Sequence, residues 1–134
     1  MLVMVCYDGS ERARAALEKT VDLFSKTKPE ILILTVTEPP LDATSTDESS
    51  FEKWKETKEE ELGEAAEWVA SSGIITDAVL AVGDPRKMIV EAAEKKKPDL
   101  LVIARRGTMG HDKVTVGSIC AYVVKYATCP VVVY

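Results

Sequence analysis

The chain has 134 residues, of which 46% are hydrophobic and 29% are charged, and its formal net charge is −5 at pH 7. This length suits one domain, 1–134, with one core. The acidic balance argues against nucleic acid as a partner, because a phosphate backbone would repel it. No apolar run approaches the roughly 18 residues that a membrane span needs. The apolar start ends at Asp8 without a basic leader or a cleavage site, so we expect a cytoplasmic protein with no membrane partner.

Neither the cysteines nor the single histidine suggests a metal site. The chain has three cysteines, an odd number, and no two of them form a CxxC motif. We therefore expect Cys6, Cys120 and Cys129 to be buried, reduced thiols. His111 stands alone beside Asp112, whereas zinc takes three or four protein ligands.

Along the chain, segments in which the spacing of apolar residues is typical of strands alternate with segments in which it is typical of helices. Ser10 is expected to cap the first helix, and Asp84 with Pro85 to start the third. Residues 39–50 are rich in Pro, Ser, Thr and Asp and are expected to form a mobile loop. The expected strands cover 2–6, 31–36, 75–82, 100–104 and 131–134, and the expected helices cover 11–27, 51–73, 85–97 and 117–126.

Five strands that are apolar on both faces, most of them followed by a helix, indicate an α/β fold with a parallel sheet covered on both sides. Such sheets bind ligands beyond the carboxyl ends of their strands. Here those ends carry polar residues and glycines, at Asp8-Gly9, Gly83-Asp84 and Arg105-Arg106-Gly107. We interpret Gly83-Asp84 as structural and expect Arg105 to point away from any pocket, because it alternates with Arg106.

The most informative stretch lies between the fourth and fifth strands. An apolar run is followed by a basic pair and Gly107, and nine residues later Gly117-Ser118 opens an amphipathic segment. A helix N-terminus presents free backbone N–H groups and the positive end of its dipole. The pattern therefore predicts an anion site, most simply for phosphate. The structural alternatives are that Gly117-Ser118 is only a helix start and that Asp8 only forms a turn.

Five segments in this order resemble the universal stress protein family over the whole chain: VCYDGS, LTVTEPP, VGDP, DLLVIARRG and VGSICAYVVKYATCPVVV. The resemblance implies a doubly wound, five-stranded parallel sheet in the order 3-2-1-4-5, with helices on both faces. It also implies a homodimer formed through the last strand, Val131–Tyr134.

Members of this family that bind ATP resemble one another in a loop of Gly, two residues, Gly, nine residues, then Gly with Ser or Thr. Gly107 matches the second glycine and Gly117-Ser118 the end of the motif. The first glycine is replaced by Ala104, which fits if its backbone does not need a positive φ. Cys120 stands where binders often carry a hydroxyl residue, and a thiol is the weaker hydrogen-bond donor.

The resemblance implies an adenine-nucleotide site for ATP or AMP, with Mg²⁺ held only through the phosphates and with no catalytic residues. The Asp8 carboxylate would accept a hydrogen bond from the base or the ribose, and the backbone of Val36 would contact adenine. The implied nucleotide-binding residues are Cys6, Tyr7, Asp8, Val36, Ala104, Arg106, Gly107, Gly117, Ser118, Ile119 and Cys120.

Two functions stay open from the sequence. The first is a dimeric regulatory module of the stress response that binds ATP, and it rests on the spacing from Gly107 to Gly117. The second is a dimeric interaction module that binds no nucleotide, and it rests on Ala104 and Cys120. The chain offers no activated nucleophile, so an efficient enzyme is not expected. Slow ATP hydrolysis, as in some family members, stays open.

Overall fold

A computed structural model describes residues 1–38, 48–105 and 117–134. Strands and helices alternate as β1 (Leu2–Cys6), α1 (Glu11–Phe24), β2 (Glu30–Thr37), α2 (Glu48–Ala70), β3 (Thr76–Val82), α3 (Pro85–Lys96), β4 (Leu100–Ile103), α4 (Ser118–Tyr126) and β5 (Val131–Val133). The strands form one five-stranded sheet in the order β3-β2-β1-β4-β5, and every neighbouring pair is parallel. The predicted fold class and strand order are confirmed.

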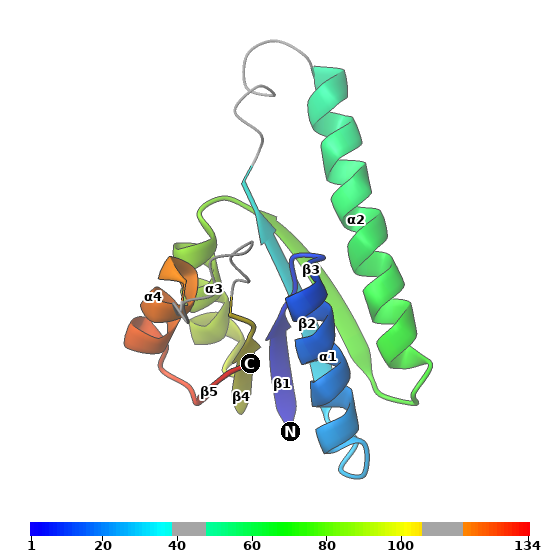
Figure 1. The fold of residues 1–134 in the computed structure, drawn as a ribbon, viewed down its shortest axis with the longest axis vertical. Helices are drawn as coiled ribbons and strands as arrows, with labels where there is room; N and C mark the ends of the chain where they lie inside the picture. The colour runs from blue at the N-terminus through cyan, green and yellow to red at the C-terminus, as the bar shows by residue number, and fades with distance from the viewer. Residues whose placement is uncertain (39–47, 106–116) are drawn as a thin grey trace.

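Helices cover both faces of the sheet, with α1 and α2 on one side and α3 and α4 on the other (Figure 1). Each face has its own apolar core because side chains alternate along a strand. In β2, Ile31 and Ile33 join the cluster that includes α1 and α2 residues, whereas Leu32 and Leu34 join the cluster that includes α3 and α4 residues. Near the carboxyl ends of the strands, the same alternation determines whether a side chain lies on the α1 and α2 face or on the α3 and α4 face.

The predicted helix starts at Ser10 and Asp84 are confirmed. The Ser10 hydroxyl accepts a hydrogen bond from the Ala13 N–H at 3.1 Å. The Asp84 carboxylate accepts one from the Arg86 N–H at 3.1 Å, with Pro85 as the first helical residue. No helix within the described ranges is long and apolar enough to cross a membrane.

The long helix starts earlier than predicted. α2 begins at Glu48, so the last three positions of the predicted loop over 39–50 are helical. The apolar period that predicted this helix begins only at Phe51, whereas the first turn of a helix needs no core-facing residue. Residues 39–47 of the predicted loop lie outside the described residues. The first half of α2 extends past the carboxyl end of the sheet (Figure 1).

Candidate functional site

A cavity of about 470 Å³ lies at the carboxyl edge of the sheet. It is lined by the ends of β1, β2 and β4, the starts of α1, α3 and α4, and one residue of α2. β1 pairs with β2 on one side and with β4 on the other, so the chain order of the strands reverses there. Ligands of open parallel sheets bind at this kind of reversal.

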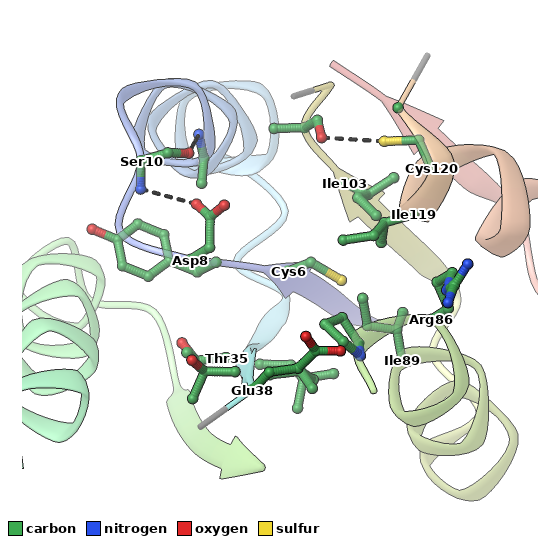
Figure 2. A pocket seen from close by; sticks show the side chains of 18 of the residues that line it. Cys6, Asp8, Ser10, Thr35, Glu38, Arg86, Ile89, Ile103, Ile119 and Cys120 are labelled. Atoms are coloured by element: carbon green, nitrogen blue, oxygen red, sulfur yellow. Dashed lines mark hydrogen bonds between the residues drawn. The ribbon is translucent and has the colours of Figure 1, made fainter. Parts of the chain in front are cut away.

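Most of the residues predicted from the sequence meet around this cavity. Nine of the eleven line it: Cys6, Tyr7, Asp8, Val36, Ala104, Gly117, Ser118, Ile119 and Cys120. Figure 2 shows Asp8 and Ser10 on one side, Ile119 and Cys120 on the other, and Cys6 between them. The remaining two, Arg106 and Gly107, lie outside the described residues.

Asp8 sits in a tight turn between β1 and α1. One oxygen of its carboxylate accepts the Ser10 N–H at 2.9 Å, while the side chain as a whole is exposed. The turn favours glycine at position 9, because its φ of +83° is a conformation that other residues rarely adopt. The turn therefore holds the Asp8 carboxylate at the cavity, consistent with both the structural and the ligand-binding interpretation.

The backbone of Val36 reaches past the last hydrogen bond between β1 and β2. The ladder ends at the pair Cys6 and Leu34, and its final bond runs from the Tyr7 N–H to the Leu34 carbonyl at 2.8 Å. In a parallel ladder, alternate residues direct their N–H and C=O toward the same neighbouring strand. The N–H and C=O of Val36 therefore point to the side where β1 has ended, which is the side of the cavity.

Apolar side chains line the part of the cavity that faces α3 and α4. Leu34, Ile89, Ile103 and Ile119 lie there, together with Cys6. Burial raises the pKa of the Cys6 thiol to about 12, and nearby Cys120 and Asp8 add to the rise. Cys6 is therefore a neutral thiol at physiological pH, so this wall suits a flat, uncharged ring.

The start of α4 lies on this same side of the cavity, across from Asp8 and Ser10. Gly117 is the N-cap, with φ −52° and ψ 162°, and it provides no side-chain cap. Ser118, the first helical residue, is exposed. The first N–H groups of a helix have no partner within the helix and lie at the positive end of its dipole. This end of the cavity is suited to an anionic group.

The two departures from the family's nucleotide loop contact each other. The Cys120 thiol donates a hydrogen bond to the Ala104 carbonyl at 3.2 Å. Among the described residues other than glycine, only Lys28 and Lys97 have a positive φ, so Ala104 does not occupy a conformation that requires glycine. Burial raises the pKa of Cys120, partly offset by the positive charge of Arg105.

Several lining residues were not predicted from the sequence. They are Ser10, Ala13, Leu34, Thr35, Thr37, Glu38, Lys58, Asp84, Pro85, Arg86, Ile89, Ile103 and Arg105. Arg105, which was predicted to point away from any pocket, is among the residues that line the cavity; β4 ends at Ile103, so strand alternation does not extend to Arg105. Asp84 starts α3 as predicted but also lines the cavity, with its carboxylate 3.4 Å from the Arg86 guanidinium.

Lys58 enters the cavity from the apolar stripe of α2, where its helical spacing could have identified it. Its ammonium group lies 3.3 Å from the Glu61 carboxylate.

Several universal stress proteins are similar to this chain in sequence or in fold. A protein from Bacillus subtilis, Universal stress protein YxiE, is 29% identical over 142 residues, covering 98% of this chain and 96% of that protein. A solved universal stress protein in complex with cAMP has a TM-score of 0.74 at 22% identity, covering 100% of this chain and 95% of that one. A family member from Arabidopsis thaliana with AMP bound has a TM-score of 0.69 at 23% identity, covering 99% and 90%.

The sequence model of the universal stress protein family matches residues 1–134, the whole chain. The chain therefore belongs to the universal stress protein family.

Proposed function

We propose that this protein binds an adenine nucleotide, ATP or AMP, in the cavity at the carboxyl edge of its sheet, and that it acts as a dimeric regulatory module. The observation that carries the proposal is the convergence of three different groups on one cavity. These are the Asp8 carboxylate, the backbone of Val36 beyond the end of β1, and the N-terminus of α4 at Gly117.

The two sides of the cavity match the two parts of a nucleotide. Asp8 and Val36 offer acceptors and a donor for the base and ribose, beside an apolar wall for the ring. The N–H groups at the start of α4 suit the phosphates. Solved relatives bound to cAMP and to AMP support an adenine nucleotide as the ligand class. Mg²⁺ would be held through the phosphates.

Mass spectrometry of small molecules released from the purified protein tests this proposal. Denaturation of a freshly purified sample should release an adenine nucleotide in a near-stoichiometric amount. A sample that carries none and does not respond to millimolar ATP with Mg²⁺ would contradict the proposal. In that case the Cys120–Ala104 contact becomes the explanation, because the thiol hydrogen already has an acceptor in the protein.

That same contact favours the second candidate function, a dimeric module that binds no nucleotide. Both candidates use the same dimer surface. β5 forms the outer edge of the sheet and exposes Val132, and Tyr134 directly after it is also exposed. In α4, Val124 and Tyr126 are exposed. An exposed apolar edge strand favours pairing with another strand, and a second copy of the chain supplies an identical edge.

Replacing Val132 with lysine tests the dimer. Lysine on an exposed edge opposes strand pairing, so Val132→Lys should convert a dimer into a monomer in sedimentation velocity. Ile75→Lys is the matched control, because Ile75 is 72% exposed beside β3 at the opposite edge of the sheet. A wild-type protein that sediments as a monomer at tens of micromolar would contradict the dimer.

A further inference from the structure

We propose that the hydroxyl of Thr35 is a hydrogen-bonding group for the bound nucleotide, on the base and ribose side of the cavity. This inference rests on the proposed nucleotide binding and adds a specificity-determining residue that the family motif does not include. Thr35 lies in β2, directly before Val36, and lines the cavity (Figure 2).

The hydroxyl of Thr35 is buried without a partner. Thr35 is 4% exposed, and its Oγ1 is the one buried side-chain oxygen or nitrogen in the described ranges that makes no hydrogen bond. A hydroxyl in this state has lost its hydrogen bonds to water and gained none in return. Groups of this kind are rare in folded proteins and call for a specific explanation.

The position of Thr35 in the sheet explains why the protein itself does not satisfy the hydroxyl. By strand alternation, Thr35 shares the face of Ile31 and Ile33, and its register partner on β3 is Leu80. These side chains are apolar. Along the strand, however, Thr35 is the last fully buried residue of β2, and the cavity begins there. The Oγ1 atom itself has almost no accessible surface, so the proposed contact requires a rotation about χ1 that turns the hydroxyl toward the cavity that Thr35 lines.

Within the described ranges, no polar group near Thr35 is a hydrogen-bond partner of its hydroxyl. The Lys58 ammonium is paired with the Glu61 carboxylate at 3.3 Å. Tyr7 is 4% exposed and also lines the cavity, but no hydrogen bond joins its hydroxyl to Thr35. A polar atom of the ligand is the remaining partner that the site can supply.

A second buried threonine provides an internal comparison. Thr20 in α1 is 3% exposed, and its hydroxyl donates to the Ala16 carbonyl at 2.7 Å. The two residues have the same chemistry and nearly the same burial, but only Thr35 faces a cavity and only its hydroxyl lacks a partner. The hydroxyl of Thr20 serves the fold, whereas that of Thr35 serves a bound molecule.

The proposal predicts opposite effects of one substitution on stability and on binding. Thr35→Val keeps the shape of the side chain and removes the unpaired hydroxyl. The ligand-free protein should therefore melt roughly 3 to 6 °C higher. The same change removes a hydrogen bond to the nucleotide, so the affinity for AMP should fall on the order of tenfold. A purely structural threonine would not couple these two effects.

The experiment compares the wild type with Thr35→Val, Thr35→Ser and Thr20→Val, by thermal unfolding without ligand and by calorimetric titration with AMP and with adenosine. Thr35→Ser keeps the hydroxyl and should bind AMP within about threefold of the wild type. Thr20→Val should leave AMP affinity unchanged and should not raise the melting temperature. The loss in Thr35→Val should be equal for AMP and adenosine, because Figure 2 places Thr35 away from Ile119 and Cys120 of α4.

Three results would overturn the assignment of Thr35. A Thr35→Val protein that binds AMP like the wild type would remove the role in binding. A lower melting temperature would show that the hydroxyl has a partner inside the protein. A penalty seen with AMP but not with adenosine would place its partner on the phosphate. Failure of the wild type itself to bind AMP at millimolar concentration would instead overturn the proposed function.

Discussion

The two sides of the cavity are built in different ways. On the β1 and β2 side, the groups that face the cavity are held by strand register and by a hydrogen-bonded turn, at Asp8, Thr35 and Val36. On the α4 side, they are the backbone N–H groups of a helix start, with Gly117 and Ser118. The first side presents particular atoms, whereas the second presents a local excess of positive potential.

This difference suggests a division of labour within the proposed function. A side chain or a strand edge distinguishes one heterocycle or sugar from another, because each hydrogen bond has a direction. A helix N-terminus accepts any anion of suitable size. We therefore expect changes on the first side to affect adenosine and AMP equally, and changes on the second side to affect AMP alone.

The largest expected effect comes from Gly117→Val. A branched side chain at the N-cap would cover the first N–H groups of α4, so the affinity for AMP should fall by at least about 100-fold. The affinity for adenosine should stay within about threefold. The fold should survive, because φ of −52° at Gly117 is accessible to any residue. Calorimetric titration with both ligands measures the contrast.

Gly63→Val is the matched control for that substitution. Gly63 lies in α2, and a Cβ there would meet nothing within 4 Å. Its affinity for AMP should equal that of the wild type. If Gly117→Val lowers the affinity for adenosine as much as the affinity for AMP, the start of α4 does not bind the phosphate. The proposed division between a base side and a phosphate side would then be wrong.

Asp8→Asn should have the next largest effect. The amide keeps an oxygen to accept the Ser10 N–H, so the turn is preserved, but the charged acceptor is lost. Affinity should fall about tenfold for both AMP and adenosine. Asp77→Asn is the control, since the Asp77 carboxylate also accepts a local backbone N–H, from Ala78 at 2.9 Å, but does not line the cavity. An Asp8→Asn protein with wild-type affinity would restrict Asp8 to its turn.

Cys120→Ser should have the smallest effect. A hydroxyl is a stronger donor than a thiol, and it can serve either the Ala104 carbonyl or a phosphate. Affinity for AMP should rise by about two- to fivefold, with no change for adenosine. Competitive displacement of a fluorescent AMP analogue by each ligand would resolve this difference. A weaker AMP complex would show that position 120 does not face the phosphate.

The fold was predictable because its signals are local. Apolar runs bounded by Asp, Gly and Pro marked every strand, and the caps at Ser10 and Asp84 marked two helix starts to the residue. The start of α2 was missed because a Ser- and Thr-rich segment is typical of a loop, and the apolar period of the helix begins only at Phe51. The strand order came from the family resemblance, since local patterns do not say which strands are neighbours.

The site was predictable where a motif exists and not elsewhere. Asp8, Gly117 and Ser118 belong to recognisable segments, and they line the cavity. Thr35 could not be identified from the sequence, because a threonine in a buried strand is typical of a core. Only the burial of its hydroxyl without a partner distinguishes it from Thr20. The helical spacing of Lys58 and the strand-end position of Asp84 were visible in the sequence, but only the tertiary packing shows that both residues line the same cavity.

Calorimetric titration of the ligand-free wild-type protein with AMP and, separately, with adenosine tests the central claim most directly. If one cavity binds the base through β1 and β2 and the phosphate through α4, AMP should bind with a dissociation constant in the micromolar range. Adenosine should bind in the same cavity at least about tenfold more weakly. No heat from AMP at millimolar concentration, or equal affinity for the two ligands, would contradict this account.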